Sequence, residues 1–249
     1  MIKLIIYITK LIIITITALL FASCNHNIRT IQITGSGNYI TKERHISDSF
    51  KRIKTSNAIE VKIIQGENQS VVIAADDNII DQVKTVVHDG ILQIKLENNI
   101  NFNFNSDNKI LVTVTLPEIY GITASSASTV TNEGKIRTDQ LELKASSAST
   151  ISLTIEADKL EAESSSASTI NLSGYALEAD YDSSSASSIH AEELETNNIK
   201  AEASSGSTIN VHPILKLDAE ASSGSSIKYY KTPKSLNQNT HSGGSISSN

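Results

Sequence analysis

The chain has 249 residues, with 21 lysines and arginines against 27 aspartates and glutamates and a formal net charge of −6. Only four residues are arginine, so the chain lacks the basic stripe that neutralises phosphates, and it is not expected to bind nucleic acid. It has no tryptophan and few aromatic residues, which disfavours a groove that binds sugars by stacking on rings. A single cysteine leaves no pair for a disulfide, so noncovalent packing alone must hold the fold.

The first 23 residues have the pattern of a lipoprotein signal peptide. Lys3 and Lys10 flank or interrupt an apolar stretch whose clean run, Leu11 to Phe21, has the length of a signal-peptide core and is short for a membrane span. Phe21-Ala22-Ser23-Cys24 resembles a bacterial lipobox, in which the peptide is cut before Cys24 and that cysteine is lipidated. We expect a signal peptide at residues 1–23; the alternative is an uncleaved anchor with an incidental cysteine.

Residues 24–44 would then be the lipidated cysteine and a polar tether, because the segment is rich in Asn, Thr and Gly. Asn25 follows the cysteine where an aspartate would resemble the inner-membrane retention signal of enteric bacteria. The expected location is therefore the cell envelope, as an outer-membrane lipoprotein held to the membrane by its lipid. Whether it faces the periplasm or the outside stays open.

Residues 45–118 are expected to form an N-terminal region of short strands. Apolar residues alternate or run together in five segments, and turn signals at Gly66-Glu67-Asn68 and Asp89-Gly90 separate them. The predicted strands are 50–53, 59–63, 71–74, 92–96 and 110–116.

Two polar segments in this region invite a functional interpretation. Asp76-Asp77-Asn78 precedes an apolar run and is expected to open a short helix or turn, with metal binding as the less favoured alternative. Asn98 to Asn108 is an Asn-rich insertion with Phe102 and Phe104 at alternate positions. If exposed, the two rings would be weak candidates for a contact surface; the alternative is that both lie under the loop.

A seven-residue serine phrase recurs through residues 119–230. It reads ASSASTV ending at Val130, and its later copies end at Ile151, Ile170, Ile189, Ile209 and Ile227, spaced 21, 19, 19, 20 and 18 residues apart. A period near twenty residues is the signature of a solenoid, in which each coil buries its apolar face only against its neighbours. The polar tail, 231–249, contains SGGSI, which is expected to be a degenerate last coil.

Apolar residues alternate with charged ones before each phrase, as in Leu141, Leu143 and Ala145, and alternate again after it, as in Ile151 and Leu153. Period-two alternation predicts a strand on each side of the phrase. We therefore expect an all-β, right-handed parallel β-helix-like solenoid of 18–21 residues per coil, with the N-terminal strands capping one end. An open edge at the other end would allow a homo-oligomer.

The serine phrase itself is interpreted as a device for turning and stacking. Ala127 and its equivalents become Gly206 and Gly224, which predicts a steric limit on side-chain size at a bend or crowded interior. The equivalents of Ser128 are expected to hydrogen-bond to one another or to the turning backbone. The alternative is a functional hydroxyl row, for ligand display or ice binding, made of Thr129, Thr150, Thr169, Ser188, Thr208 and Ser226.

No catalytic constellation is apparent. The repeated serines lack a GxSxG elbow and an oriented base, and His190, His212 and His241 occupy different repeat positions. Asp180 and Asp182 flank Tyr181 on one strand and are interpreted as part of an exposed acidic face. With no Cys/His cluster or P-loop, we expect no catalytic residue, metal or cofactor.

Several segments together resemble the bacterial DUF2807 family, also called the putative auto-transporter adhesin, head GIN domain. They are Phe50 to Ile53, Ile59 to Gly66, Val71 to Asn78, Asp89 to Lys95, and the STIN sequences around Ile170 and Ile209. The resemblance implies a right-handed parallel β-helix-like fold in envelope lipoproteins or secreted proteins, and it brings no catalytic residues.

The leading hypothesis is a non-enzymatic cell-envelope lipoprotein whose solenoid presents a surface for binding or adhesion to an unidentified protein or glycan. The alternatives are a carbohydrate-active β-helix enzyme and a purely structural or sensory envelope protein.

Overall fold

The computed structural model describes residues 7, 10–11, 15, 31–97, 100–103 and 109–249. Cys24 as the lipidation site, Phe104 and most of the expected signal peptide therefore lie outside the described residues. Within them, no helix combines the length and the apolar character that crossing a bilayer requires.

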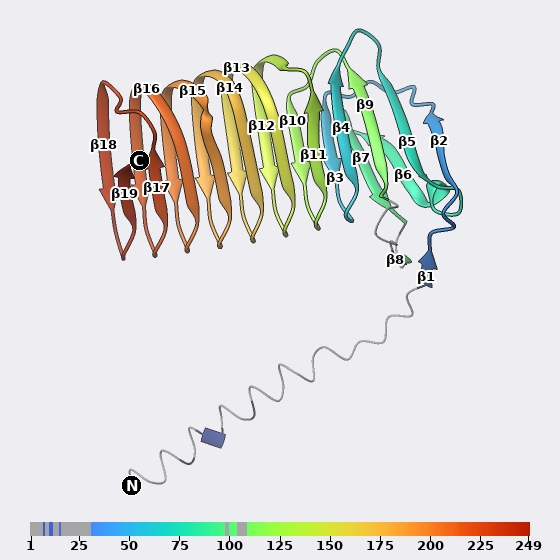
Figure 1. Ribbon diagram of the computed structural model, residues 1–249, viewed down its shortest axis with the longest axis horizontal. Coiled ribbons are helices and arrows are strands. Elements are labelled where there is room, and N and C mark those ends of the chain that lie inside the picture. The colour runs from blue at the N-terminus through green and yellow to red at the C-terminus, as the bar shows by residue number, and fades with distance from the viewer. Residues whose placement is uncertain (1–6, 8–9, 12–14, 16–30, 98–99, 104–108) are drawn as a thin grey trace.

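The chain winds into a β-solenoid, which confirms the expected all-β fold (Figure 1). Its regular part comprises β12 (Ile136–Ala145), β13 (Thr150–Ser164), β14 (Thr169–Ser183), β15 (Ser188–Ala203) and β16 (Thr208–Ala221), each paired in parallel with the next. β13 to β16 each start near the end of one serine phrase, bend midway and end at the first residue of the next phrase. β12 forms only the second side of its coil, because β11 (Thr129–Glu133) forms the first. A coil therefore has two sides, which meet at a sharp serine turn on one edge and at a broad bend on the other (Figure 1).

The N-terminal region continues the same solenoid, but its coils do not stack in chain order. β3 (Arg52–Thr55) and β4 (Glu60–Gln65) form one coil, and β7 (Ile91–Leu96) and β9 (Leu111–Leu116) form another. β10 (Gly121–Ala124) and β11 (Thr129–Glu133) pair with β3 and β4, which in turn pair with β7 and β9. The connection from β9 to β10 thus passes over an intervening coil. The insertion between β7 and β9 replaces a tight turn.

Antiparallel strands cover the outer side of the β7–β9 coil, so the expected N-terminal cap is confirmed. β5 (Ser70–Asp76) pairs with β9, β2 (Tyr39–Arg44) pairs with β5, and β6 (Val83–His88) pairs with β7.

The tether expected over residues 24–44 needs correction, because β1 (Ile31–Thr34) and β2 are strands within it. β1 pairs in parallel with β8 (Ile100–Asn103), which places Phe102 opposite Ile33 in the register. β2 has an exposed, polar sequence and no inward apolar face, so its pairing with β5 was not visible as an alternating pattern.

The acidic segment at the end of β5 opens the expected turn and short helix, but its side chains do not cap that helix. The short 3₁₀ helix η1 (Ile80–Gln82) has no side-chain cap. The Asp77 carboxylate instead accepts hydrogen bonds from the Ser36 hydroxyl at 2.5 Å and from Asn38 Nδ2 at 2.9 Å, which lowers the pKa of Asp77. Asp77 therefore secures the loop between β1 and β2 against the cap.

The C-terminal tail confirms the predicted degenerate coil. β18 (Ser235–Thr240) pairs with β16, and β19 (Ser245–Ser248) pairs with β17 (Ser226–Tyr229). Inward positions of this coil carry Gln238 and Thr240 beside Leu236, so its inner face is more polar than that of earlier coils, as in a terminal repeat. The outer edges of β18 and β19 pair with no described strand. The homo-oligomer through this edge stays a prediction.

The tight turns rest on left-handed backbone at two consecutive residues. In the first phrase, Ser126 has φ 52° and Ala127 has φ 60°, and the Ser128 N–H donates to the Ser125 carbonyl at 3.2 Å. Positive φ at both central residues defines a type I′ turn. Ala127 is exposed, and a Cβ at the equivalent Gly206 would contact nothing within 4 Å. The expected steric limit was therefore wrong, because the position has open space; the left-handed backbone explains the change to Gly.

The serine that closes each turn is buried and links successive coils. The equivalent residues are Ser128, Ser149, Ser168, Ser187, Ser207 and Ser225. Ser168 Oγ donates to the carbonyl of Ala145 in the preceding coil at 2.8 Å and accepts from the Ser165 N–H at 3.1 Å. Ser149 and Ser225 repeat both bonds. The predicted stacking role of these hydroxyls is thus confirmed.

Replacing an alanine of the turn by glycine is expected to stabilise the protein. For Ala148→Gly, relief of the left-handed strain outweighs the added freedom of the unfolded chain by about 0.5–1 kcal/mol. Urea denaturation of the full chain measures the difference, and Gly206→Ala is the reverse control. Equal midpoints for both variants and the wild type would contradict this explanation of the turn.

Candidate functional site

The two sides of the solenoid carry different chemistry. The side that precedes the tight turns, here called the charged face, has outward residues in register along β12 to β16. They are Glu142 and Lys144, Glu161 and Glu163, Asp180 and Asp182, Lys200 and Glu202, and Asp218 and Glu220. Tyr181 between the two aspartates is buried, so the interpretation of Asp180 and Asp182 as exposed surface is confirmed.

Lysines on the charged face pair with many of its carboxylates. Lys144 lies 3.0 Å from Glu142 and 3.6 Å from Glu163, and Lys200 lies 2.7 Å from Glu202. Arg52 also pairs with Glu142 and ties the N-terminal coils to the repeats. A shallow hollow of about 260 Å³ between these side chains is lined by these paired groups and by Asp180 and Asp182, which form no ion pair among the described residues.

Asp182 lies among like charges, because it is in register between Glu163 and Glu202. Partial burial, followed by repulsion from these neighbours and Asp180, raises its pKa above 3.8. A raised folded-state pKa means that ionised Asp182 destabilises the fold at neutral pH, and this penalty disappears as the pH falls below both pKa values.

Asp182→Asn is therefore expected to raise the free energy of unfolding at pH 7 by roughly 0.2–1 kcal/mol, towards the low end because the side chain is exposed. The gain should vanish at pH 3. Glu142→Gln is the matched control with the opposite sign, since hydrogen bonds from Arg52 and then Lys144 lower the pKa of Glu142 below 4.5. Urea titrations at the two pH values measure both variants. A loss of stability in Asp182→Asn at pH 7 would contradict the repulsion.

The side that follows the tight turns, here called the hydroxyl face, has mostly short uncharged side chains at the outward positions nearest the turns, although Lys228 follows Asn210 in the second row. The row next to the turn is Thr129, Thr150, Thr169, Ser188, Thr208 and Ser226, in register from strand to strand. The next row runs through Thr131, Ser152, Asn171, His190 and Asn210. The hydroxyl row considered from the sequence is thus one edge of a wider polar face.

A bulge in β15 interrupts this face. Asn171 pairs with His190, but Ser173 pairs with Glu193, so β15 holds one more residue than β14 between these points. Against β16 the difference is larger. Ala191 pairs with Val211 and Glu195 pairs with His212, so β15 holds three more residues than β16 between these points. Bulges bend a strand and redirect its side chains. Here the bulge raises Glu192 and Glu193 beside the row of hydroxyl and amide groups.

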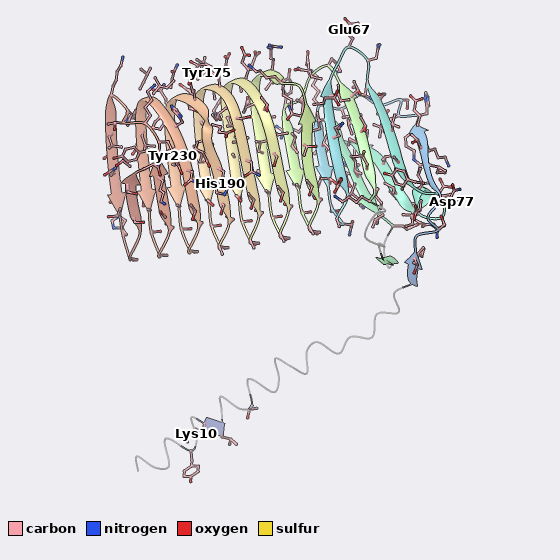
Figure 2. All side chains as sticks on the ribbon, in the orientation of Figure 1. Lys10, Glu67, Asp77, Tyr175, His190 and Tyr230 are labelled. Carbon is pink, nitrogen blue, oxygen red and sulfur yellow. The ribbon has the colours of Figure 1, made fainter. Side chains whose placement is uncertain are left out.

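The bulge forms one wall of a groove of about 450 Å³. Its lining includes Ser152, Thr154, Asn171, Ser173, His190, Glu192 and Glu193, above the buried Leu153 and Leu172. Figure 2 marks His190 on the body of the solenoid, away from Tyr175 at the broad bend.

Hydrogen bonds between neighbouring coils hold these side chains in place. Asn171 Nδ2 donates to Ser152 Oγ at 2.9 Å, and the hydroxyls of Thr154 and Ser173 lie 2.9 Å apart. Asn210 Nδ2 donates to His190 Nδ1 at 3.2 Å. The groove is therefore prearranged by the stacking of the coils.

The bulge also places Glu192 near two histidines that occupy different repeat positions. His190 Nδ1 lies 3.9 Å from Glu192 Oε1, and His212 Nδ1 lies 3.1 Å from the Glu192 backbone oxygen. The sequence signal was an excess of one residue in the coil between Ile189 and Ile209, which follows two coils of 19. That signal locates an irregularity without predicting which side chains it gathers.

Other predicted site residues stand apart from this groove. Phe102 lies on β8 near the cap, and Cys24 and Phe104 fall outside the described residues. In the part of the chain that the structure describes, no group of three or more His, Cys, Asp or Glu side chains is arranged to hold a metal ion.

Comparison with known proteins identifies relatives in family and fold. The family model described as "Putative auto-transporter adhesin, head GIN domain" (DUF2807) matches residues 49–233. A structure of a "putative adhesin" from Bacteroides fragilis has a TM-score of 0.80 at 22% identity, over 87% of this chain and 100% of that one. No curated protein matches in sequence.

Two structures from Parabacteroides show the same fold at lower identity. A "putative lipid binding protein" from P. distasonis has a TM-score of 0.71 at 18% identity, over 88% of this chain and 99% of that one. A "putative adhesin" from P. merdae has a TM-score of 0.69 at 20% identity, over 88% of this chain and 100% of that one. At these identities the likeness supports the fold alone.

Proposed function

The chain belongs to the DUF2807 family of adhesin-like head domains, and on that premise we propose that it is a non-enzymatic lipoprotein of the cell envelope whose solenoid binds an external ligand. The observation that carries the proposal is the groove on the hydroxyl face, whose side chains are held in register by the stacked coils. A rigid polar surface of this kind suits recognition.

Anchoring is proposed to occur through Cys24, on the strength of the lipobox Phe21-Ala22-Ser23-Cys24. A lipid at that position would hold the solenoid at a membrane while leaving both of its faces accessible. Residues 25–30 separate the cysteine from β1.

The experiment compares cells that carry the full chain with cells that carry Cys24→Ala. We expect the wild type to incorporate labelled palmitate, to fractionate with the outer membrane and to promote adhesion of the cells to a glycan- or protein-coated surface. Cys24→Ala should lose the label and the adhesion, while the control Asn27→Ala, which lies close to the cysteine but outside the lipobox, should keep both.

Two results would overturn the proposal. Palmitate incorporation and membrane fractionation unchanged in Cys24→Ala would exclude the lipid anchor. Release of reducing sugar ends from a polysaccharide by the purified chain would replace the binding function by an enzymatic one.

A further inference from the structure

Resting on the proposed binding function, we propose that the groove beside the β15 bulge is a site for an uncharged oligosaccharide, bound by hydrogen bonds without ring stacking. The charged residues that line the groove are all acidic. The residues lining the groove include Glu192 and Glu193 but no lysine or arginine. Anionic sugars such as uronates or sulfated glycans would be repelled there, because no cation offsets the two carboxylates.

The groove offers both donors and acceptors of hydrogen bonds. Ser152, Thr154 and Ser173 provide hydroxyls, Asn171 provides an amide, and the two glutamates provide acceptors. Sugar hydroxyls both donate and accept, so they complement such a mixed set. The groove volume of about 450 Å³ falls within the range of about 300–1,000 Å³ that is common for small-ligand sites.

The two glutamates of the groove are not held in ion pairs with any described lysine or arginine and can accept hydrogen bonds from a ligand. Among the ion pairs of the described residues, neither Glu192 nor Glu193 meets a lysine or arginine, in contrast to Glu142 and Glu202 on the charged face. Glu192 Oε2 and Asn210 Oδ1 are buried acceptors that no donor reaches in the described part of the chain. A ligand hydroxyl could satisfy Glu192 after rotation of its side chain, which is one-third exposed.

The two faces of the solenoid differ in the charge of their outward residues. Exposed strand positions are commonly charged, which favours solubility, and the charged face follows that rule. The hydroxyl face departs from it on β13 and β14, whose outward residues Ser152, Thr154, Asn171 and Ser173 line the groove. Stacking alone does not require this, since the charged face stacks in the same register.

The test uses the purified full chain in detergent on an array of neutral hexose and N-acetylhexosamine oligosaccharides, with their uronate and sulfated counterparts. The groove variant is Asn171→Ala with Glu193→Gln. Its matched control is Asn198→Ala with Glu163→Gln, which makes the same changes at exposed positions of the charged face. Thermal melting of each variant verifies that it folds.

We expect neutral oligosaccharides to bind, the groove variant to lose about tenfold or more in affinity, and the control to stay within about twofold of the wild type. Binding only to uronate or sulfated glycans would overturn the ligand class, and a loss confined to the control would overturn the site. If no array glycan binds while cells carrying the chain still adhere, this inference fails and the proposed function stands. If adhesion is absent as well, both fail.

Discussion

Replacing Tyr181 by alanine is expected to lower the free energy of unfolding by about 3–5 kcal/mol. Tyr181 is fully buried in the middle of the solenoid, and the residues in register with it on the adjacent coils are Ala162 and Ala201. Its ring fills the space that those small side chains leave. Because each coil is held on both sides by a backbone ladder, the strands cannot move together to close the cavity. Urea denaturation of the full chain measures the loss.

Tyr181→Phe is the matched control, since it keeps the ring. Burial raises the pKa of Tyr181 far above its usual value, so the hydroxyl is neutral throughout the accessible pH range and no charge is lost in this variant. We expect it to cost at most about 1.5 kcal/mol. A similar loss for both variants would show that the hydroxyl, and not the packing of the ring, stabilises the centre of the solenoid.

Gly174→Ala is expected to destabilise the protein by more than about 2 kcal/mol. Gly174 has φ +112°, and a Cβ at this position would lie 2.1 Å from the carbonyl oxygen of Ile155 on the adjacent coil. The alanine can be accommodated only if β13 and β14 separate locally. Because Ser173 lines the groove, the same variant should also weaken ligand binding.

Gly134→Ala provides the comparison for this prediction. Gly134 has φ +75°, but a Cβ there would contact nothing within 4 Å, so only the backbone strain of about 1–2 kcal/mol applies. Differential scanning calorimetry of the two variants separates the clash from the strain. If both lost the same stability, the close approach to Ile155 would carry no energetic weight.

Much of the solenoid was predictable because its signals are local and repeated. The alternation around Leu141, Leu143 and Ala145 specifies a strand with one buried face, and the period places equivalent strands side by side. The tight turn between β3 and β4 was missed because Asn57 and Ala58 carry the left-handed backbone there, while Ile59 occupies the place of the buried serine. Without that serine, the turn does not resemble the phrase.

The spatial order of the N-terminal coils and the groove could not be predicted for a different reason. The placement of β3 and β4 between β9 and β10 depends on long-range pairing that no short pattern encodes. The groove depends on the bulge in β15, where Pro213 of β16 has no N–H to donate to the ladder and the register shifts nearby. Single residues of this kind decide which side chains meet.

The central claim is that the tight turns are scaffold and that the hydroxyl face carries the function. Adhesion of cells bearing the full chain to an oligosaccharide-coated surface tests it most directly, with two variants that remove polar groups from different places. Ser147→Gly with Ser166→Gly and Ser185→Gly changes exposed, left-handed turn residues, and Asn171→Ala with Glu193→Gln changes the groove. We predict that the turn variant adheres like the wild type and that the groove variant detaches. Adhesion lost in the turn variant but kept in the groove variant would contradict the claim.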